Sequence, residues 1–349
     1  MRADSTVIAT SVSVRARLVM ASLRAQRSKR FYGDPGEMVA DLGRHQRASM
    51  TRPPWWLRRR VRYRSEEVAG TPCRWIEPAA GAGRVRVLYL HGGGFVEQPQ
   101  HHHWRFLRWL VETTGASVVM PIYPLAPAAD HRAIRRSVRA VYDLRVAIHP
   151  GPRVVAGDSA GGALAVDLAC SVRDEDGRIP SAVALGSPWL DMGVSDPRSD
   201  EVDPYDPELD IDGLKMAGRW YAGPDGVGSS EINPLAGDLT GLPPTVVLTG
   251  TRDLLNPDAR RFVSLADAAG VDVELHEYPG MFHNWYMHLL PEGEQARRDL
   301  AVFLGRTGCS DGTVSGTGVS RWNDVATCAR RAAARICSVA DHRPPRGLA

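Results

Sequence analysis

The sequence contains no long uninterrupted run of apolar residues. The nearest candidate, residues 7–20, is broken by Arg15 and Arg17, whereas a membrane-spanning helix needs about 20 apolar residues. Asp4 and the same two arginines also spoil the pattern of a secretory signal, which needs a basic start, an unbroken apolar run and a small-residue cleavage site. We therefore expect neither a membrane span nor a signal peptide, and we predict a cytoplasmic protein.

Cysteine is scarce, with five residues in a chain of 349. No two of them form a CxxC pair, and none lies in a Cys/His cluster with the spacing of metal ligands, so neither a disulfide scaffold nor a zinc site is expected. The run His101, His102 and His103 looks like a metal tract. Adjacent side chains point to different sides of a helix or strand, so we interpret the run as polar residues that open a helix.

The net charge of +3 is unevenly distributed. Residues 1–64 contain fifteen Lys and Arg against four Asp and Glu, whereas residues 191–212 contain nine acids against one arginine. A basic arm can bind nucleic acid or an anionic membrane. No nucleic-acid motif accompanies the charge, so we expect the arm to pack against the acidic remainder of the chain. The acidic stretch lacks the spacing of a calcium loop and is interpreted as a solvated surface.

Short β-branched runs alternate with longer helical patterns from about residue 70 to residue 305. The strands are apolar throughout, which is typical of a mostly parallel sheet with helices on both faces, an α/β fold. Strands are expected at residues 73–77, 85–90, 117–120, 153–156, 182–185, 245–248 and 271–276. Helices are expected at residues 102–113, 131–148, 160–174, 258–268 and 292–304. Ligands of such sheets bind beyond the carboxyl ends of the strands.

Two segments fall outside this alternation. Residues 1–70 are expected to be helical, and residues 191–235 hold no predicted strand and are rich in Pro, Gly and acids. We interpret both as parts of a cap over the carboxyl edge of the sheet. The predicted organisation is an N-terminal helical cap segment (1–70), an α/β domain (71–306) with the cap insertion at about 191–235, and a tail (307–349) that lacks periodicity and is expected to be disordered.

The strongest local signal is Gly-Asp-Ser-Ala-Gly at residues 157–161, between an apolar run and a predicted helix. A serine on a sharp strand-to-helix turn has its hydroxyl lifted clear of the sheet, and only small neighbours fit there. The GxSxG pattern alone recurs by chance, but the flanking strand and helix make it informative. The sequence therefore predicts Ser159 as a nucleophile, supported by Asp158 in the same motif.

The second signal is His91-Gly92-Gly93-Gly94, directly after a predicted strand. Three consecutive glycines weaken any regular element, and a flexible turn would need only one or two of them. The alternative is an oxyanion hole, in which the backbone N–H groups of Gly92, Gly93 and Ala160 point at the reacting carbonyl oxygen. We favour this interpretation because the loop and the serine turn occur together, each at a strand end. His91 is expected to brace the loop rather than to titrate.

A serine nucleophile needs a histidine base and a carboxylate that orients it, in the chain order serine, acid, histidine. His283 follows a predicted strand and a turn, where a base has freedom to move, whereas His276 lies inside that strand and His288 in a predicted helix. Asp253 comes directly after another strand. Asp258 is the rival acid, but it is better explained as a residue of the first turn of the next helix.

The paired motifs resemble those of the hormone-sensitive-lipase-like branch of the α/β-hydrolases, which carries an HGGG loop and a GDSAGG elbow. The sequence is most similar to bacterial acetyl-hydrolases and short-chain esterases, over about residues 70–305. The resemblance implies an α/β-hydrolase fold with a cap built partly from N-terminal helices, and chemistry that uses no cofactor and no metal. Related esterases often dimerise, so a homodimer is possible. The resemblance assigns the site roles to Ser159, Asp253, His283, Gly92, Gly93 and Ala160, with His91, Gly94 and Asp158 as supporting residues.

We accordingly predict a serine carboxylesterase that acts on small-molecule esters with short to medium acyl chains. Three alternatives remain: hydrolysis of N-acetyl amides by the same residues, a ligand receptor on a hydrolase scaffold, and a lipase that docks on membranes through the basic arm. A receptor has no reason to keep the complete set of catalytic residues. Four tryptophans could line an acyl pocket, although packing is the default role of such side chains: Trp55, Trp56, Trp189 and Trp285.

Overall fold

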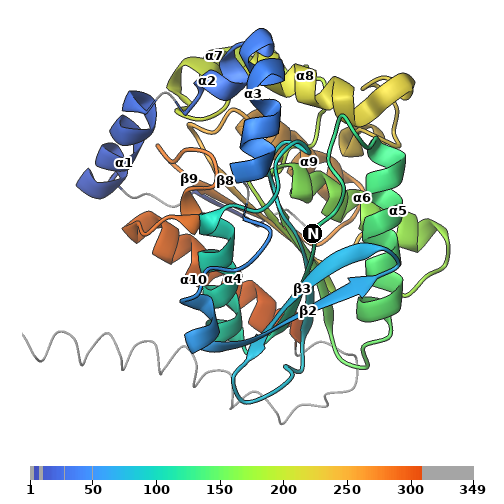
Figure 1. Ribbon diagram of the computed structural model, residues 1–349. Helices are drawn as coiled ribbons and strands as arrows, with labels where there is room; N and C mark the ends of the chain where they lie inside the picture. The colour runs from blue at the N-terminus through green and yellow to red at the C-terminus, as the bar shows by residue number, and fades with distance from the viewer. Residues whose placement is uncertain (1–3, 8–10, 27, 49, 309–349) are drawn as a thin grey trace, which may run out of the picture. The chain divides into compact units, whose positions relative to one another are not determined.

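The fold is built on one large sheet, here seen in a computed structural model that describes residues 4–7, 11–26, 28–48 and 50–308 (Figure 1). Its nine strands run in the order β1-β9-β8-β7-β6-β4-β5-β3-β2. The strands are β1 (Asp4–Val7), β2 (Val61–Val68), β3 (Thr71–Pro78), β4 (Arg86–Leu90), β5 (Ser117–Pro121), β6 (Arg153–Asp158), β7 (Ala182–Gly186), β8 (Thr245–Gly250) and β9 (Val273–Tyr278). The β2–β3 and β3–β5 pairs are antiparallel, and the other pairs are parallel. The predicted mostly parallel sheet is confirmed.

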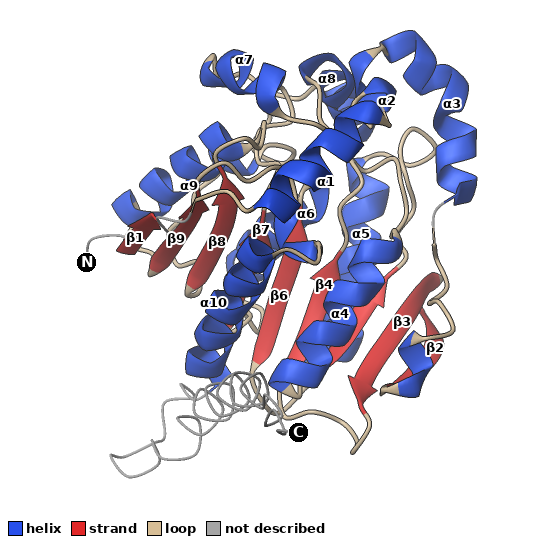
Figure 2. Ribbon diagram, turned by 90° about the vertical axis from the view of Figure 1, so that its left-hand side faces the viewer, coloured by secondary structure: helices blue, strands red, loops and turns tan. Residues whose placement is uncertain are grey.

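Helices cover both faces of this sheet (Figure 2). The five predicted helices are present as α4 (His101–Thr114), α5 (His131–Val141), α6 (Ala160–Asp174), α9 (Asn256–Ala268) and α10 (Pro291–Gly308). The predicted helix 131–148 differs in its last part, because α5 continues as a π-helix over Tyr142–Ala147. Among the described residues, no helix is long and apolar enough to cross a membrane.

Alternate residues of each central strand enter two separate hydrophobic cores. In β4, Leu88 and Leu90 join the core formed with α5, α6 and α9. Val87 and Tyr89 of the same strand join the core formed with α4 and α10. Burial on both faces explains why the strands are apolar throughout instead of alternating with polar residues.

The N-terminal 70 residues are not entirely helical, contrary to our expectation. Residues 61–68 form β2, which pairs with β3 through a two-residue turn in which Ala69 and Gly70 both have positive φ angles. Such turns match the twist of paired strands. β1 pairs in parallel with β9 at the opposite edge. Both strands lie at sheet edges, where a strand is bonded on one side only, so β2 can carry charged side chains that resemble a helical pattern.

The cap lies over the carboxyl ends of the parallel strands and combines two distant segments (Figure 1). The N-terminal segment contributes α2 (Arg30–Gly33) and α3 (Pro35–Ala48), and the insertion contributes α7 (Arg198–Val202) and α8 (Ile211–Ala222). A Cβ atom on Gly213 of α8 would lie 2.1 Å from the carbonyl oxygen of Tyr32, so only glycine permits this approach. The helix α1 (Val14–Ala25) is joined to α10 instead, because Ser13 donates hydrogen bonds to Glu292 from its backbone N–H at 2.6 Å and from its hydroxyl at 3.0 Å.

Charge partly explains how the two cap segments hold together. Lys29 forms ion pairs with Asp203 at 2.9 Å and with Asp210 at 3.5 Å. This agrees with the expectation that the basic arm packs against the acidic part of the chain. The expectation is wrong for the arginine run 58–60, whose side chains are exposed. The prediction of a disordered tail from residue 307 is wrong for Thr307 and Gly308, which belong to α10. Residues 309–349 of that tail lie outside the described residues.

Candidate active site

The predicted nucleophile occupies a strained turn between β6 and α6. Ser159 has φ 52° and ψ −123°, a backbone conformation that costs on the order of 1–3 kcal/mol. A Cβ atom on Gly157 would lie 2.2 Å from the carbonyl oxygen of Gly161, and one on Gly161 would lie 2.0 Å from that of Leu90. The two glycines of the GxSxG pattern are therefore required by close backbone contacts. Ser159 is only 4% exposed, so the turn is covered.

The predicted acid and base meet at the carboxyl ends of neighbouring strands β8 and β9. His283 Nδ1 lies 3.0 Å from Asp253 Oδ1, and both side chains are buried. A carboxylate can only accept, so Nδ1 carries a proton, and in the neutral imidazole Nε2 carries the lone pair that can accept another. Burial alone would lower the pKa of His283, but Asp253, helped by Asp206 and Glu208, raises it to about 9.

Within the described part of the chain, no hydrogen bond joins Ser159 Oγ to His283; the contact partner of His283 Nε2 is Asn284 Nδ2 at 3.3 Å. The same amide nitrogen donates to Asp158 Oδ2 at 3.1 Å, one residue before Ser159. His283 therefore lies beside the serine turn. Catalytic hydrogen bonds are commonly long in the absence of substrate and shorten in the reacting complex.

Asp158 is the polar centre of the site. Its fully buried carboxylate accepts hydrogen bonds from the Tyr89 hydroxyl and the Gly92 backbone N–H on Oδ1, and contacts His103 Nε2 and Asn284 Nδ2 through Oδ2. Burial alone would raise the pKa of Asp158, but His103 and the hydrogen bonds from His103 and Tyr89 hold that pKa well below its usual range. Asp158 is therefore ionised at neutral pH.

The contact with Asp158 corrects one predicted oxyanion donor. The backbone N–H of Gly92 donates to Asp158 Oδ1 at 2.9 Å, so it is bonded to a carboxylate instead of being available to an oxyanion. The sequence could not reveal this, because it does not show in which direction the Asp158 carboxylate points. Gly93 and Gly94 have φ angles of 116° and 59°, which turn the loop sharply. For Gly93 and Ala160 the role of oxyanion donor stays a prediction.

Two histidines support this loop without taking part as bases. His91 is fully buried, stacks on the Tyr123 ring at 4.2 Å and donates from Nδ1 to the carbonyl oxygen of Gly92 at 2.8 Å. Burial and the nearby His103 lower the pKa of His91 to about 3, so it is neutral, as expected of a brace. His103 opens α4, as the interpretation of the histidine run requires, and its Nδ1 accepts a hydrogen bond from the backbone N–H of Gln100. Its contact with Asp158 was not foreseen.

The rival acid and histidines lie elsewhere. Asp258 is in the first turn of α9, as expected, where burial and neighbouring Asp191 and Asp196 raise its pKa to about 8. His276 is held in β9 with Nε2 3.2 Å from Glu274. His288 lies in the connection between the short helix Trp285–Met287 and α10, so its predicted placement in a helix is wrong.

Part of the acidic stretch of the cap reaches the site, which contradicts its interpretation as a solvated surface. Asp206 is 2% exposed and its Oδ2 accepts the backbone N–H of Leu254, the neighbour of Asp253, at 2.8 Å. Burial and the charge of Asp253 raise the pKa of Asp206 to about 6. Burial also raises the pKa of the neighbouring Glu208 to about 8. A pattern of charges cannot distinguish these residues from exposed acids.

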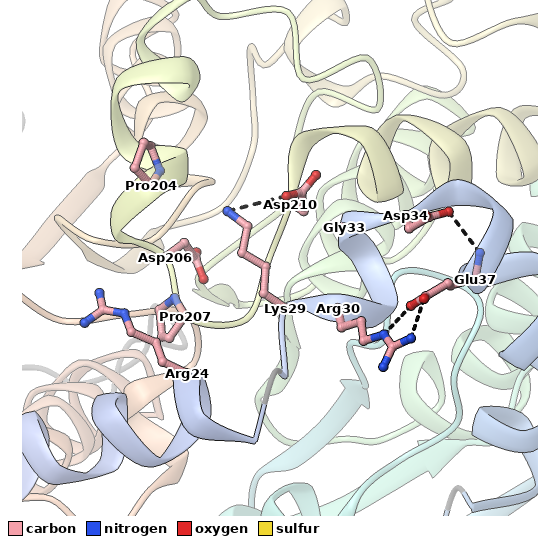
Figure 3. Close-up of a pocket in the computed structure, with 10 residues that line it drawn as sticks. All are labelled: Arg24, Lys29, Arg30, Gly33, Asp34, Glu37, Pro204, Asp206, Pro207 and Asp210. Carbon is pink, nitrogen blue, oxygen red and sulfur yellow. Dashed lines mark hydrogen bonds and ion pairs between the residues drawn. The ribbon is translucent and has the colours of Figure 1, made fainter.

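A cavity of about 670 Å³ lies where the two cap segments meet (Figure 3). It is lined by Arg24, Lys29, Arg30, Gly33, Asp34, Glu37, Pro204, Asp206, Pro207 and Asp210. Figure 3 shows Lys29 reaching towards Asp210 across the cavity, and Arg30 paired with Glu37. Pockets for apolar ligand groups are lined mainly by apolar side chains. This charged cavity is therefore not an acyl pocket, although it borders the site through Asp206.

The tryptophans divide into packed and exposed residues. Trp189 and Trp285 are completely buried, and the backbone N–H of Trp189 donates to the carbonyl oxygen of Ser159 at 3.0 Å. Trp55 is 69% exposed, with the Arg59 guanidinium 4.4 Å from its ring centre. Trp56 lies beside His101. Packing accounts for two of the four, and Trp189 also holds the serine turn.

Comparison with known proteins identifies the family. The family described as the alpha/beta hydrolase fold matches residues 87–287. An acetyl-hydrolase of Streptomyces hygroscopicus is 35% identical over 243 residues, or 68% of this chain and 80% of that protein. An esterase of Acinetobacter venetianus is 31% identical over 251 residues, or 70% and 82%. The crystal structure of an esterase from the bacterial hormone-sensitive lipase family has a TM-score of 0.73 at 28% identity and covers 85% of this chain and 99% of that one.

The chain therefore belongs to the α/β-hydrolase family. Within that family it groups with the hormone-sensitive-lipase-like esterases and acetyl-hydrolases, which confirms the resemblance carried by the HGGG loop and the GDSAGG elbow.

Proposed function

We propose that this protein is a serine carboxylesterase that hydrolyses esters with short to medium acyl chains, with Ser159 as nucleophile, His283 as base and Asp253 as the orienting acid. The observation that carries the proposal is the 3.0 Å contact between His283 Nδ1 and Asp253 Oδ1, beside a serine in a strained strand-to-helix turn. The family supports the ester-hydrolase class.

The reaction begins when the Ser159 hydroxyl attacks the ester carbonyl and His283 Nε2 takes its proton. Asp253 orients the imidazole and stabilises its charged form. Backbone N–H groups of Gly93 and Ala160 bind the oxyanion, and each such donor contributes about 2.7–4 kcal/mol to transition-state stabilisation. The alcohol leaves with the proton from His283, and a water molecule activated by the same base then hydrolyses the acyl-enzyme.

The test is a rate profile across p-nitrophenyl esters from acetyl to palmitoyl, together with labelling by a fluorophosphonate probe. The variant Ser159→Ala should lose both turnover and labelling, while Ser264→Ala, an exposed serine on α9, should keep both. Maximal rates are expected at short to medium chain length. Unchanged hydrolysis by purified Ser159→Ala would refute the proposal, and a maximum at palmitoyl would favour the membrane-docking lipase instead.

Hydrolysis of N-acetyl amides is the second candidate, because one relative is named an acetyl-hydrolase and that name does not specify an ester. The same three residues would serve, but an amine is a poorer leaving group than an alcohol and depends more on protonation by His283. Rates on an acetate ester and on the matching acetamide separate the two activities. We expect faster hydrolysis of the ester. A small-molecule ester substrate, a cytoplasmic location and a homodimer belong to the same proposal.

A further inference from the structure

His283 Nε2, the atom that takes the proton in the proposed reaction, is contacted by Asn284 in the resting site. Asn284 Nδ2 lies 3.3 Å from His283 Nε2 and 3.1 Å from Asp158 Oδ2. An amide nitrogen carries two hydrogens and can only donate. One amide group therefore donates both to the base and to the carboxylate next to the nucleophile.

The backbone of Asn284 fixes this arrangement. Its φ of 53° and ψ of 25° lie in the left-handed region, which Gly, Asn and Asp adopt more readily than other residues. Its backbone N–H donates to Ser187 Oγ at 3.0 Å, and the residue is 9% exposed. Because the backbone is anchored in this way, the short side chain can reach Asp158 and the ring of its own neighbour.

The link continues from Asp158 to the oxyanion loop. Asp158 Oδ2 accepts from Asn284, while Oδ1 of the same carboxylate accepts the backbone N–H of Gly92. A buried path of hydrogen bonds thus runs from the base, through one amide and one carboxylate, to the HGGG loop. Among the described residues the amide oxygen of Asn284 has no hydrogen-bond partner, so the side chain joins this path through its amide nitrogen alone.

We propose that Asn284 is a positioning residue, whose amide holds His283 Nε2 and couples the base, through Asp158, to the serine turn and the oxyanion loop. This inference rests on the proposed function. The amide can donate to Nε2 only while the imidazole is neutral, so the contact favours the form of His283 that acts as a base. The contact with the amide acts against the carboxylates that face the ring, because these favour the charged imidazole. They are Asp253 after β8, and Asp206 and Glu208 of the cap insertion.

The test compares the variants Asn284→Gly and Asn284→Asp. Glycine keeps the left-handed backbone and removes the amide, and aspartate keeps the shape but loses both donors and adds a charge. We expect kcat of Asn284→Gly on p-nitrophenyl acetate to fall at least about 10-fold with KM changed less than about 2-fold. The acid limb of its kcat/KM profile should move to higher pH, and that of Asn284→Asp should move further.

A matched control is Asp176→Gly. Asp176 also has a φ of 53° but is exposed in the turn after α6, so this variant reports the effect of glycine at such a position and should keep wild-type kinetics. Thermal unfolding identifies any variant that does not fold. If Asn284→Asp does not fold, Asn284→Gly decides alone.

Fluorophosphonate labelling gives an independent readout, because its rate reports activation of the nucleophile. Slower labelling of folded Asn284→Gly than of the wild-type protein supports the inference. If this variant is labelled at the wild-type rate and the acid limb of its kcat/KM profile is unshifted, the inference is overturned. A different result would refute the proposed function, namely the absence of labelling at Ser159 in the wild-type protein itself.

Discussion

The carboxylate of Asp158 and the backbone N–H of Gly92 form a 2.9 Å hydrogen bond that joins the serine turn to the oxyanion loop. Asp158 is the last residue of β6 and Gly92 lies in the loop after β4, and these two strands are neighbours in the sheet. Their bond connects the turn that carries the proposed nucleophile directly to the loop that carries the proposed oxyanion donors.

Replacement of Asp158 by asparagine should disturb both stability and activity. The amide nitrogen of asparagine cannot accept hydrogen bonds, so it would face donors that now point at a carboxylate oxygen. Each hydrogen bond to a charged group contributes about 1.5–3 kcal/mol to stability. We expect the free energy of unfolding of Asp158→Asn to fall by about 2–3 kcal/mol and kcat to fall with it. Urea unfolding and ester kinetics measure the two effects. The control Asp143→Asn, in the exposed pair with Arg139, should change stability by less than about 0.5 kcal/mol.

The raised pKa of His283 predicts an alkaline activity profile. The base acts only when it is neutral, so a pKa of about 9 requires kcat/KM to increase as pH rises through that value. Glu208→Gln removes one charge that raises this pKa, and its acid limb should move to lower pH. The exposed Glu201 of α7 is a matched control, and Glu201→Gln should leave the limb in place. An acid limb at the ordinary histidine value of about 6.5 in the wild-type protein would contradict the prediction.

Glycine at position 161 is required by packing. A Cβ there would lie 2.0 Å from the carbonyl oxygen of Leu90 and 2.8 Å from that of His91, and these backbone atoms cannot move aside as the end of a flexible side chain can. Gly161→Ala should therefore lower the free energy of unfolding by at least about 3 kcal/mol, or prevent soluble expression. Gly305→Ala in α10, where no atom lies within 4 Å of the added Cβ, should stabilise by about 0.5–1 kcal/mol. Thermal or urea unfolding of the two variants would show whether the first loses stability and the second gains it.

The chain has only two lysines, which makes the cap contact easy to test. Lys29→Met breaks the pairs with Asp203 and Asp210, and partly exposed pairs contribute up to about 1 kcal/mol. We expect faster amide hydrogen exchange in residues 28–48, with little change in the sheet. Lys215→Met in α8 serves as the control. Equal exchange in both variants would show that the ion pairs do not hold the cap.

The sequence was sufficient for the parts of this protein that depend on local patterns. The buried strands were predicted because both of their faces are apolar, and α6 was predicted with its observed bounds because the glycine-rich turn marks its start. β2 was missed because an edge strand carries the same polar composition as a surface helix. β1 lies in the stretch predicted to be helical, and its partner β9 is more than 260 residues away in the chain.

The residues of the candidate site also fall into those that the sequence could predict and those that it could not. Ser159, Asp253 and His283 could be proposed because each follows a strand and carries the required chemistry. Asn284 and His103 could not, because their contacts depend on the direction of the Asp158 carboxylate. That direction is a property of the folded chain and leaves no trace in residue spacing.

The ion pairs that join the two halves of the cap also make the protein responsive to ionic strength. Electrostatic screening acts over about 10 Å in 0.1 M salt and over shorter distances in more concentrated solutions. The lysine at the cap junction is 27% exposed, so dissolved ions can compete for it, whereas the apolar cores beneath are insensitive to such competition. Rising salt concentration should thus weaken the contact between the two cap segments while leaving the sheet and its cores unchanged.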